Sequence, residues 1–208
     1  MSKSFKTAKI VFIILLLLSI SLASEFDNYK CLIHNVEYPF EYLMAQKENK
    51  IDFIDRDIFT APLRLIKKYE ILEWNIISII DDVTVHLKNI FSDQYLCASN
   101  KDFLPLNDLN ARLFSKKRRL VNMLEEKEID VNCEWRLEKI EPKTKDSKKY
   151  KGNKYRFWNV YYNQSLYAVS NFLNGRNKLR AVYLWHKKPD SDQFSWFIDC
   201  MTGTFLTE

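Results

Sequence analysis

Glycine is scarce in this sequence, and so are the motifs that depend on it. The three glycines, at positions 152, 175 and 203, stand too far apart for a phosphate-binding loop, a dinucleotide-binding fingerprint or a G-x-S-x-G nucleophile turn. The segment H-E-x-x-H is also missing, because His34, His86 and His186 are scattered along the chain. The carboxylate pairs Asp81-Asp82 and Glu125-Glu126 lie in charge-rich, turn-like contexts, where acids are ordinarily solvated. We therefore expect a protein without enzyme activity.

The sequence has no C-x-x-C pair, which argues against a structural zinc site. The cysteines are even in number, and all follow the first 24 residues. In an oxidising compartment such a set is expected to form two disulfides. We predict neither a metal nor an organic cofactor. Several pairings are open to the four residues Cys31, Cys97, Cys133 and Cys200.

Long hydrophobic runs are absent except near the N-terminus. Residues 1–9 carry three lysines and no acid, the apolar run IVFIILLLLSISL follows, and Ser21 and Ala23 are small residues suited to a cleavage point. This pattern predicts a secretory signal peptide over residues 1–23. The alternative is an uncleaved membrane anchor, but the run is shorter than the roughly 20 residues that span a bilayer. We expect cleavage, secretion to the extracellular space and no membrane association afterwards.

Charge of one sign is also lacking once the signal peptide is removed. Loss of Lys3, Lys6 and Lys9, with no acid lost, lowers the net charge from +5 to +2. A nearly neutral protein has no general field for nucleic acid, so no nucleic-acid partner is expected. The remaining chain, residues 24–208, has the length of one domain with a real core. We expect that domain to be monomeric.

One ten-residue sequence pattern recurs along the chain. The segment NVYYNQSLYA at 159–168 is similar to NIFSDQYLCA at 89–98. A weaker copy, NVEYPFEYLMA, lies at 35–45. An alternating, strand-like segment precedes each copy, at 31–35, 83–89 and 155–159. Repeats of this length indicate a fold built from similar units.

Two further landmarks follow each copy in the same order. The first is a strand with arginine and apolar residues, expected at 63–66, 119–124 and 180–185. The second is a strand with tryptophan, in EWNIISI, EWRLEKI and SWFIDC, and both gaps between these tryptophans are 61 residues. The structural repeat residues are thus Trp74, Trp135 and Trp196.

Three units of about four strands predict an all-β protein with the β-trefoil fold. The units cover approximately 30–80, 81–141 and 153–201. A propeller is the alternative, but three blades are fewer than its usual closed ring. Closure of a trefoil pairs the first strand with the last and removes open strand edges. It therefore favours Cys31–Cys200, with Cys97–Cys133 inside the second unit. We expect the tryptophans and the Leu-x-Ala positions to be core and hairpin-cap residues, and the repeated Asn and Gln to bond the main chain at turns.

With tryptophan strands closing three units, the sequence resembles β-trefoils of the broad ricin-B type. The segments NVYYNQSLYA and SDQFSWFIDC also resemble the C-terminal trefoil of insect haemolymph low-molecular-weight lipoproteins. Sugar-binding ricin-type units carry a Q-x-W triplet. Here the triplets are Leu72-Glu73-Trp74, Cys133-Glu134-Trp135 and Phe194-Ser195-Trp196, and Gln193 stands one position too early. No functional residue of that family therefore carries over.

Two groups of residues are candidates for ligand binding. The first is basic: Lys116, Lys117 and Arg118, with Lys148 and Lys149 in a second lysine-rich segment, 141–154. Such residues suit an anionic polysaccharide, although a solvated surface or a protease-processing site is the alternative. Arg119 aligns with Arg180, which indicates a structural role. The second group is aromatic, with core packing as its alternative, and consists of Tyr161, Tyr162, Trp185 and His186.

Asn163-Gln164-Ser165 is an N-glycosylation sequon at a predicted turn, which is where a glycan is accommodated. The sequence therefore predicts a secreted, disulfide-stabilised glycoprotein that binds an extracellular glycan, glycosaminoglycan or protein through its loops. One alternative is a protease inhibitor acting through an exposed loop at 101–119 or 141–154. Another is a storage or lipid-carrier protein, which the lipoprotein resemblance implies.

Overall fold

The computed structural model describes residues 29–45, 58–66, 69–79, 84–102, 118–141, 153–173, 179–186 and 191–201. The expected signal peptide, residues 1–23, lies outside the described residues. Within the described ranges, no helix has the length and apolar character needed to cross a bilayer.

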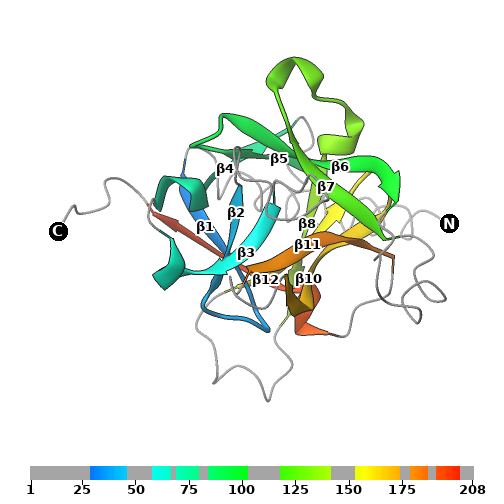
Figure 1. The fold of residues 1–208 in the computed structure, drawn as a ribbon. Coiled ribbons are helices and arrows are strands. Elements are labelled where there is room, and N and C mark those ends of the chain that lie inside the picture. Colours follow the sequence, from blue (N-terminus) through cyan, green and yellow to red (C-terminus); the bar gives the residue numbers. More distant parts are fainter. Residues whose placement is uncertain are drawn as a thin grey trace, which may run out of the picture.

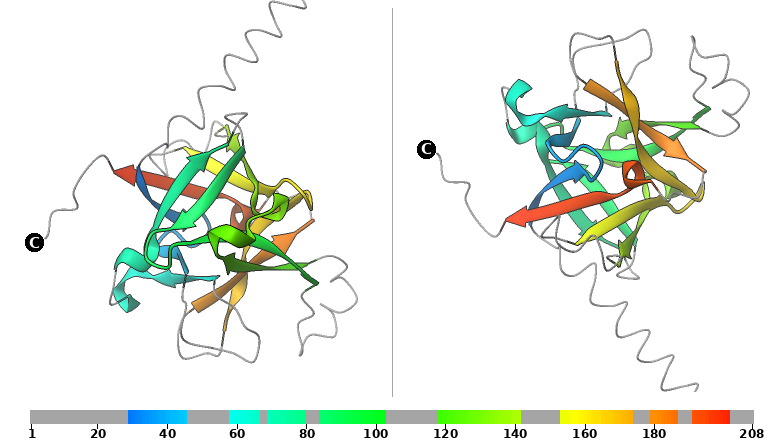
Figure 2. Two further views of the ribbon diagram at one scale, coloured as in Figure 1. Left: turned by 90° about the horizontal axis from the view of Figure 1, so that it is seen from above. Right: turned by 90° about the horizontal axis from the view of Figure 1, so that it is seen from below.

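Six antiparallel strands close into a barrel (Figure 2). Around the ring, β1 pairs with β4, β4 with β5, β5 with β8, β8 with β9, β9 with β12, and β12 with β1. Their inward-facing positions alternate with outward-facing ones, as the sequence pattern predicts. The barrel strands are β1 (Lys30–Asn35), β4 (Glu73–Ser78), β5 (Thr84–Asn89), β8 (Trp135–Ile140), β9 (Lys154–Asn159) and β12 (Trp196–Met201).

Three hairpins cover one end of the barrel. They consist of β2 (Glu41–Ala45) with β3 (Ile58–Pro62), β6 (Gln94–Asp102) with β7 (Arg119–Leu124), and β10 (Gln164–Leu173) with β11 (Leu179–Trp185). The hairpins meet where β11 pairs with both β3 and β7, as Figure 1 shows. The protein is therefore a β-trefoil, and the prediction from the repeat is confirmed.

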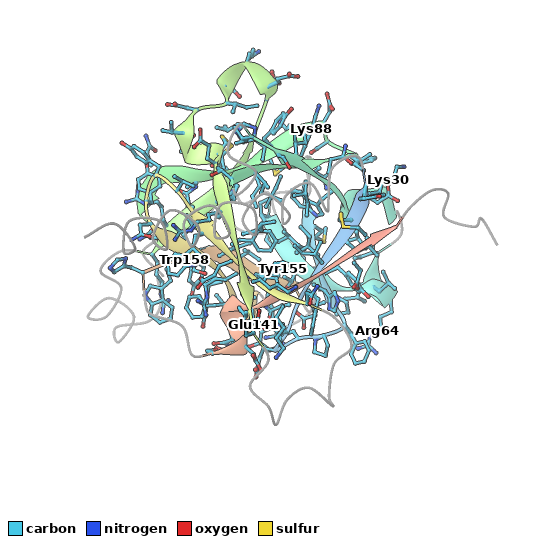
Figure 3. The ribbon with its side chains drawn as sticks, turned by 180° about the vertical axis from the view of Figure 1, so that it is seen from behind. Lys30, Arg64, Lys88, Glu141, Tyr155 and Trp158 are labelled. Carbon is cyan, nitrogen blue, oxygen red and sulfur yellow. A yellow bond between two sulfur atoms is a disulfide. The ribbon has the colours of Figure 1, made fainter. Side chains whose placement is uncertain are left out.

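One expected strand is wrong. The segment 63–66 does not form the third strand of the first unit, because β3 ends at Pro62 and the 3-10 helix η1 (Leu63–Leu65) follows. Arg64 is exposed on η1 (Figure 3). The register explains the error, because Leu43 pairs with Thr60 just as Leu96 pairs with Met123. The residue four positions before Thr60, where the other units have their arginine, is Arg56, outside the described residues.

The three repeated tryptophans are fully buried at the centre of the core. Each indole N–H donates to the main-chain carbonyl of the leucine in the Leu-x-Ala triplet of its own unit. The N···O distances are 3.0 Å from Trp74 to Leu43, 2.8 Å from Trp135 to Leu96 and 3.2 Å from Trp196 to Leu166. Each bond ties the fourth strand of a unit to the second and satisfies the indole inside an apolar core.

The repeated asparagines have one common function. Each side-chain amide donates to two main-chain carbonyls just before a tryptophan strand, and its oxygen accepts a main-chain N–H in the turn that follows. Asn159, for example, donates to Asn132 and Glu134 and accepts from Tyr162. Asn35 and Asn89 make the equivalent bonds. Asparagine is required because a single side chain must both donate and accept.

A short 3-10 segment before each tryptophan strand covers the outer side of one hairpin, and the contact differs in each unit. These segments are η2 (Tyr69–Leu72), η4 (Val131–Cys133) and η5 (Asp192–Phe194), while η3 (Glu126–Glu128) precedes η4. In unit one Met44 and Leu72 share an apolar cluster. In unit two Cys97 and Cys133 form a disulfide with an S–S distance of 1.99 Å. In unit three the rings of Tyr167 and Phe194 lie 4.6 Å apart.

The second disulfide joins Cys31 to Cys200, with an S–S distance of 2.00 Å. These residues face each other across the β1–β12 pair, where the first and last strands close the barrel. The connectivity is the one that closure of the trefoil favours.

Candidate functional site

Unit three is richest in aromatic side chains on the outer side of its hairpin. Tyr167 and Tyr183 lie opposite each other on β10 and β11, and their ring centroids are 5.1 Å apart. Phe194 packs against Tyr167 from η5, and Trp185 at the end of β11 lies 5.3 Å from Tyr167 and 6.0 Å from Phe194. Trp185 is partly exposed, whereas the other three rings are buried. The cluster thus presents one indole to solvent on a rigid aromatic base.

Arg118 lies over this cluster. Its guanidinium carbon is 4.4 Å from the centroid of the Trp185 ring and 5.2 Å from that of Tyr183. The pairing of β7 with β11, in which Leu120 faces Tyr183, brings Arg118 beside the aromatic cluster. Across the described residues, no carboxylate pairs with Arg118 and no carbonyl accepts its N–H groups. Arg118 thus contacts two rings and has no anionic partner among the described residues, and a guanidinium in that state can bind an anion.

Gln193 completes the polar part of the cluster. Its Nε2 donates to the Tyr38 hydroxyl at 2.8 Å, and its Oε1 accepts from the Tyr167 hydroxyl at 3.0 Å and from Ser191 at 3.2 Å. Burial raises the pKa of the Tyr167 phenol, while the Arg118 charge acts in the opposite direction. The phenol therefore keeps its proton at neutral pH. We call Tyr38, Arg118, Tyr167, Trp185 and Gln193 the unit-three site.

One member of each group of sequence candidates therefore lies in contact with the other, Arg118 with Trp185. His186 is exposed and follows Trp185. Tyr162 lies beneath Arg119, 3.7 Å from its guanidinium, and Tyr161 packs edge-on against Tyr162. Arg119 also donates to the carbonyls of Ser99 and Asn100, so its role is structural, as its alignment with Arg180 indicates. Lys116, Lys117, Lys148 and Lys149 lie outside the described residues.

Sequence reasoning missed Tyr38, Tyr167 and Gln193 as members of the site. In the sequence, Gln193 is a glutamine one position before that of a Q-x-W triplet. The sequence does not predict where its side chain points. The residue two before the tryptophan, Phe194, points under the hairpin, while Gln193 points towards Tyr38 and Tyr167. Tyr38 comes from the opposite end of the chain, and only the closure of the barrel places it here.

A second aromatic and charged group lies on the outer side of β8 and β9, where Figure 3 labels Trp158. The Glu138 carboxylate accepts from the Trp158 indole at 2.6 Å and from Arg156 at 3.0 Å. The charges of this group are therefore paired within the protein, whereas Arg118 has no ionic partner among the described residues. Nowhere in the described ranges do three or more His, Cys, Asp or Glu side chains gather as metal ligands.

Comparison with known proteins identifies the fold. No family model and no curated protein matches the sequence. Among solved structures, the SDF2-like protein from Arabidopsis thaliana has 9% sequence identity and a TM-score of 0.61, with 83% of this chain and 93% of that chain covered. The BEL β-trefoil has 10% identity and a TM-score of 0.55, with 84% and 94% covered. The Polyporus squamosus lectin, bound to a sialylated epitope, has 12% identity and a TM-score of 0.55, with 83% and 49% covered. At these identities the likeness shows the β-trefoil fold.

Most residues of the two loops expected for a protease inhibitor are not among those that the structure describes. Of the two segments expected for a protease-inhibitory loop, residues 103–117 and 142–152 are outside the described residues. The inhibitor and lipid-carrier functions therefore stay predictions.

Proposed function

We propose that this protein is a secreted, non-enzymatic β-trefoil that binds an acidic extracellular glycan at the unit-three site. The observation that carries the proposal is Arg118, whose guanidinium lies 4.4 Å from Trp185 without a carboxylate partner in the described residues. A carboxylate or sulfate group on a sugar is an anion of the size and geometry that a guanidinium binds in bidentate fashion.

The neighbouring side chains suit the rest of a sugar. The partly exposed indole of Trp185 offers an apolar surface. The second N–H of the Gln193 amide and the O–H of Tyr38 offer donors for sugar hydroxyls, since their bond to each other uses neither. The site is largely pre-formed, because β11, β7 and η5 hold its members in mutual contact. Pre-formed sites bind without a large ordering cost. The Polyporus squamosus lectin, whose fold is similar, was solved with a sialylated glycan, which supports this ligand class.

Secretion is supported by two observations. The two disulfides, Cys31–Cys200 and Cys97–Cys133, are typical of proteins that fold in an oxidising compartment. The N-terminal segment has the charge and hydropathy pattern of a signal peptide.

The test is binding of the protein, secreted from eukaryotic cells, to immobilised heparin and to an array of acidic and neutral glycans. We expect retention on heparin above about 0.15 M salt, or binding to acidic members of the array and not to neutral ones. Arg118→Ala is expected to weaken binding about tenfold or more, because a charge-assisted bond is lost. Arg118→Lys is expected to bind at an intermediate level, since it keeps the charge without the planar fork.

Arg136→Ala is the matched control, because Arg136 is exposed on β8 and its removal changes the net charge equally. Equal losses from Arg118→Ala and Arg136→Ala would indicate general charge attraction and overturn the site. Elution from heparin below physiological salt, with no array signal, would overturn the ligand class. Inhibition of proteases at micromolar concentration, or lipid retained in native mass spectrometry, would then favour the alternatives.

A further inference from the structure

The turn between β9 and β10 has a conformation that suits asparagine. Asn159 pairs with Gln164 across the turn, and Asn163 has a backbone φ of 49°. This left-handed region is open to few residues other than glycine, and asparagine and aspartate are the usual ones. The Asn163 side chain is exposed, and it has no hydrogen bond to any other residue in the described ranges.

The equivalent turn in unit two has an aspartate in the same left-handed conformation. Asp93 has a φ of 57°, and its carboxylate pairs with Lys88 at 2.7 Å. At the position of Lys88, unit three has Trp158, whose indole bonds to Glu138. Asn163 therefore stands at a position where aspartate also fits, and its side-chain amide makes no hydrogen bond within the described ranges.

Ser165 is the second unusual residue. The equivalent position holds Tyr95 in unit two and Tyr42 in unit one. Ser165 is fully buried, and its hydroxyl has no hydrogen-bond partner in the described part of the chain. A buried hydroxyl without a partner costs stability compared with a methyl group, by the desolvation of a polar atom. The folded protein thus carries a serine that its packing does not favour.

One modification, made on the chain before it folds, accounts for both Asn163 and Ser165. We infer that Asn163 carries an N-linked glycan, with Ser165 retained because the glycosylating enzyme reads its hydroxyl in the unfolded chain. In the transfer, Nδ2 of Asn163 bonds to the anomeric carbon of the first N-acetylglucosamine of a lipid-linked donor. The bond from that carbon to the lipid diphosphate breaks, the diphosphate leaves with the electron pair, and one amide proton is released. This inference requires the secretion that the proposed function includes.

Tyr161 is placed to support the first sugar. It precedes Asn163 by two residues in the same turn and is 61% exposed. Its ring is held edge-on by Tyr162, 4.7 Å away, and Tyr162 is held in turn by Arg119. An exposed aromatic ring two residues from the attachment point offers a surface for the apolar C–H face of a pyranose. The glycan therefore packs on Tyr161.

The first experiment compares wild type, Asn163→Asp, Ser165→Ala and Ser165→Thr, each secreted from eukaryotic cells and analysed by intact mass and peptide-N-glycosidase digestion. We expect the wild type and Ser165→Thr to carry a glycan at residue 163, and the other two to lack it. A wild-type peptide with unmodified Asn163 would overturn the inference. In the unglycosylated state, Ser165→Ala is expected to melt no lower than Asn163→Asp. A fall of about 2–4 °C or more would assign the hydroxyl a structural role instead.

The second experiment tests the sugar contact with Tyr161→Ala and, as the matched control, Phe91→Ala at the equivalent position of unit two. We expect Tyr161→Ala to lower the melting temperature by about 2–4 °C more with the glycan than after its removal. Phe91→Ala is expected to have the same effect in both states, and equal effects for Tyr161→Ala would overturn the packing. A protein that binds acidic glycans with Asn163 unmodified overturns only this inference. A glycosylated protein that binds none overturns only the proposed function.

Discussion

The guanidinium of Arg180 in β11 lies 3.6 Å from the centroid of the Tyr38 ring, in the turn after β1. Its Nε donates to both carboxylate oxygens of Glu41 at 2.9 and 2.7 Å, and Nη1 donates to the carbonyls of Val169 and Ser170. The third unit is thereby joined to the first by a buried ion pair as well as by the β1–β12 ladder.

The same arrangement recurs between units two and three. Arg119 lies over Tyr162 and donates to the carbonyls of Ser99 and Asn100, which correspond to Val169 and Ser170. An arginine at the start of the third strand thus covers the turn tyrosine of the next unit. The repeated arginine joins neighbouring units through these contacts.

Arg180→Ala is expected to lower the free energy of unfolding by about 3–5 kcal/mol, because it leaves the Glu41 carboxylate buried without its counter-charge. The measurement is urea unfolding at neutral pH, with Arg136→Ala as the exposed control. A loss below about 1 kcal/mol, the value of a surface ion pair, would contradict the prediction.

The cost of Arg180→Ala is expected to depend on pH. Burial raises the pKa of Glu41 above its usual value of 4.5, and attraction to Arg180 lowers it in part. Without Arg180 the pKa moves further up. A carboxyl with a raised folded pKa stabilises the fold below its unfolded pKa and loses that contribution as pH rises through the folded pKa. The deficit of Arg180→Ala is therefore expected to be larger at pH 8 than near pH 4.5.

The control for that pH dependence is Glu41→Gln combined with Arg180→Ala, in which no carboxyl titrates at this place. Its deficit relative to Glu41→Gln alone is expected to stay constant with pH. An equal slope in the two backgrounds would assign the pH dependence to other groups.

Asn159→Ala is expected to lower the free energy of unfolding by about 1–3 kcal/mol, since the carbonyls of Asn132 and Glu134 lose their donor. Asn159→Asp is expected to be no better than alanine, because a carboxylate accepts from Tyr162 but donates to neither carbonyl. Thermal unfolding measures both variants. Near-wild-type stability of Asn159→Asp would show that the turn bond alone matters.

The contact beneath the second hairpin is expected to be interchangeable with that of the first. Replacement of Cys97 and Cys133 by alanine removes a disulfide that closes a loop with a sequence separation of 36. The expected cost is about 4 kcal/mol in the chain-entropy model. Replacement of the same pair by methionine and leucine, the residues of unit one, is expected to recover part of that loss through apolar burial. Denaturant unfolding compares the two double variants, and equal stabilities would contradict the equivalence.

The sequence by itself determined the repeated elements. Alternating residues, three tryptophans and three asparagines at matching positions define strands and turns, because each interaction lies within one unit or between neighbouring units. The bond from Trp135 to Leu96 and those of Asn159 are of this kind. Closure of the barrel also followed from the repeat, and it placed Cys31 beside Cys200.

The candidate site depended on tertiary structure. Tyr38, Arg118 and Trp185 belong to three different units, and no local pattern relates them. The pairing of β7 with β11 and the closure of β1 on β12 bring them together. The third strand of the first unit was also not predicted from the sequence. Thr60 occupies an inward position that apolar residues hold in the other units, and its hydroxyl donates to Glu41. Local sequence encodes periodicity and turn chemistry. Side chains from separate units come together only when the hairpins pack against one another.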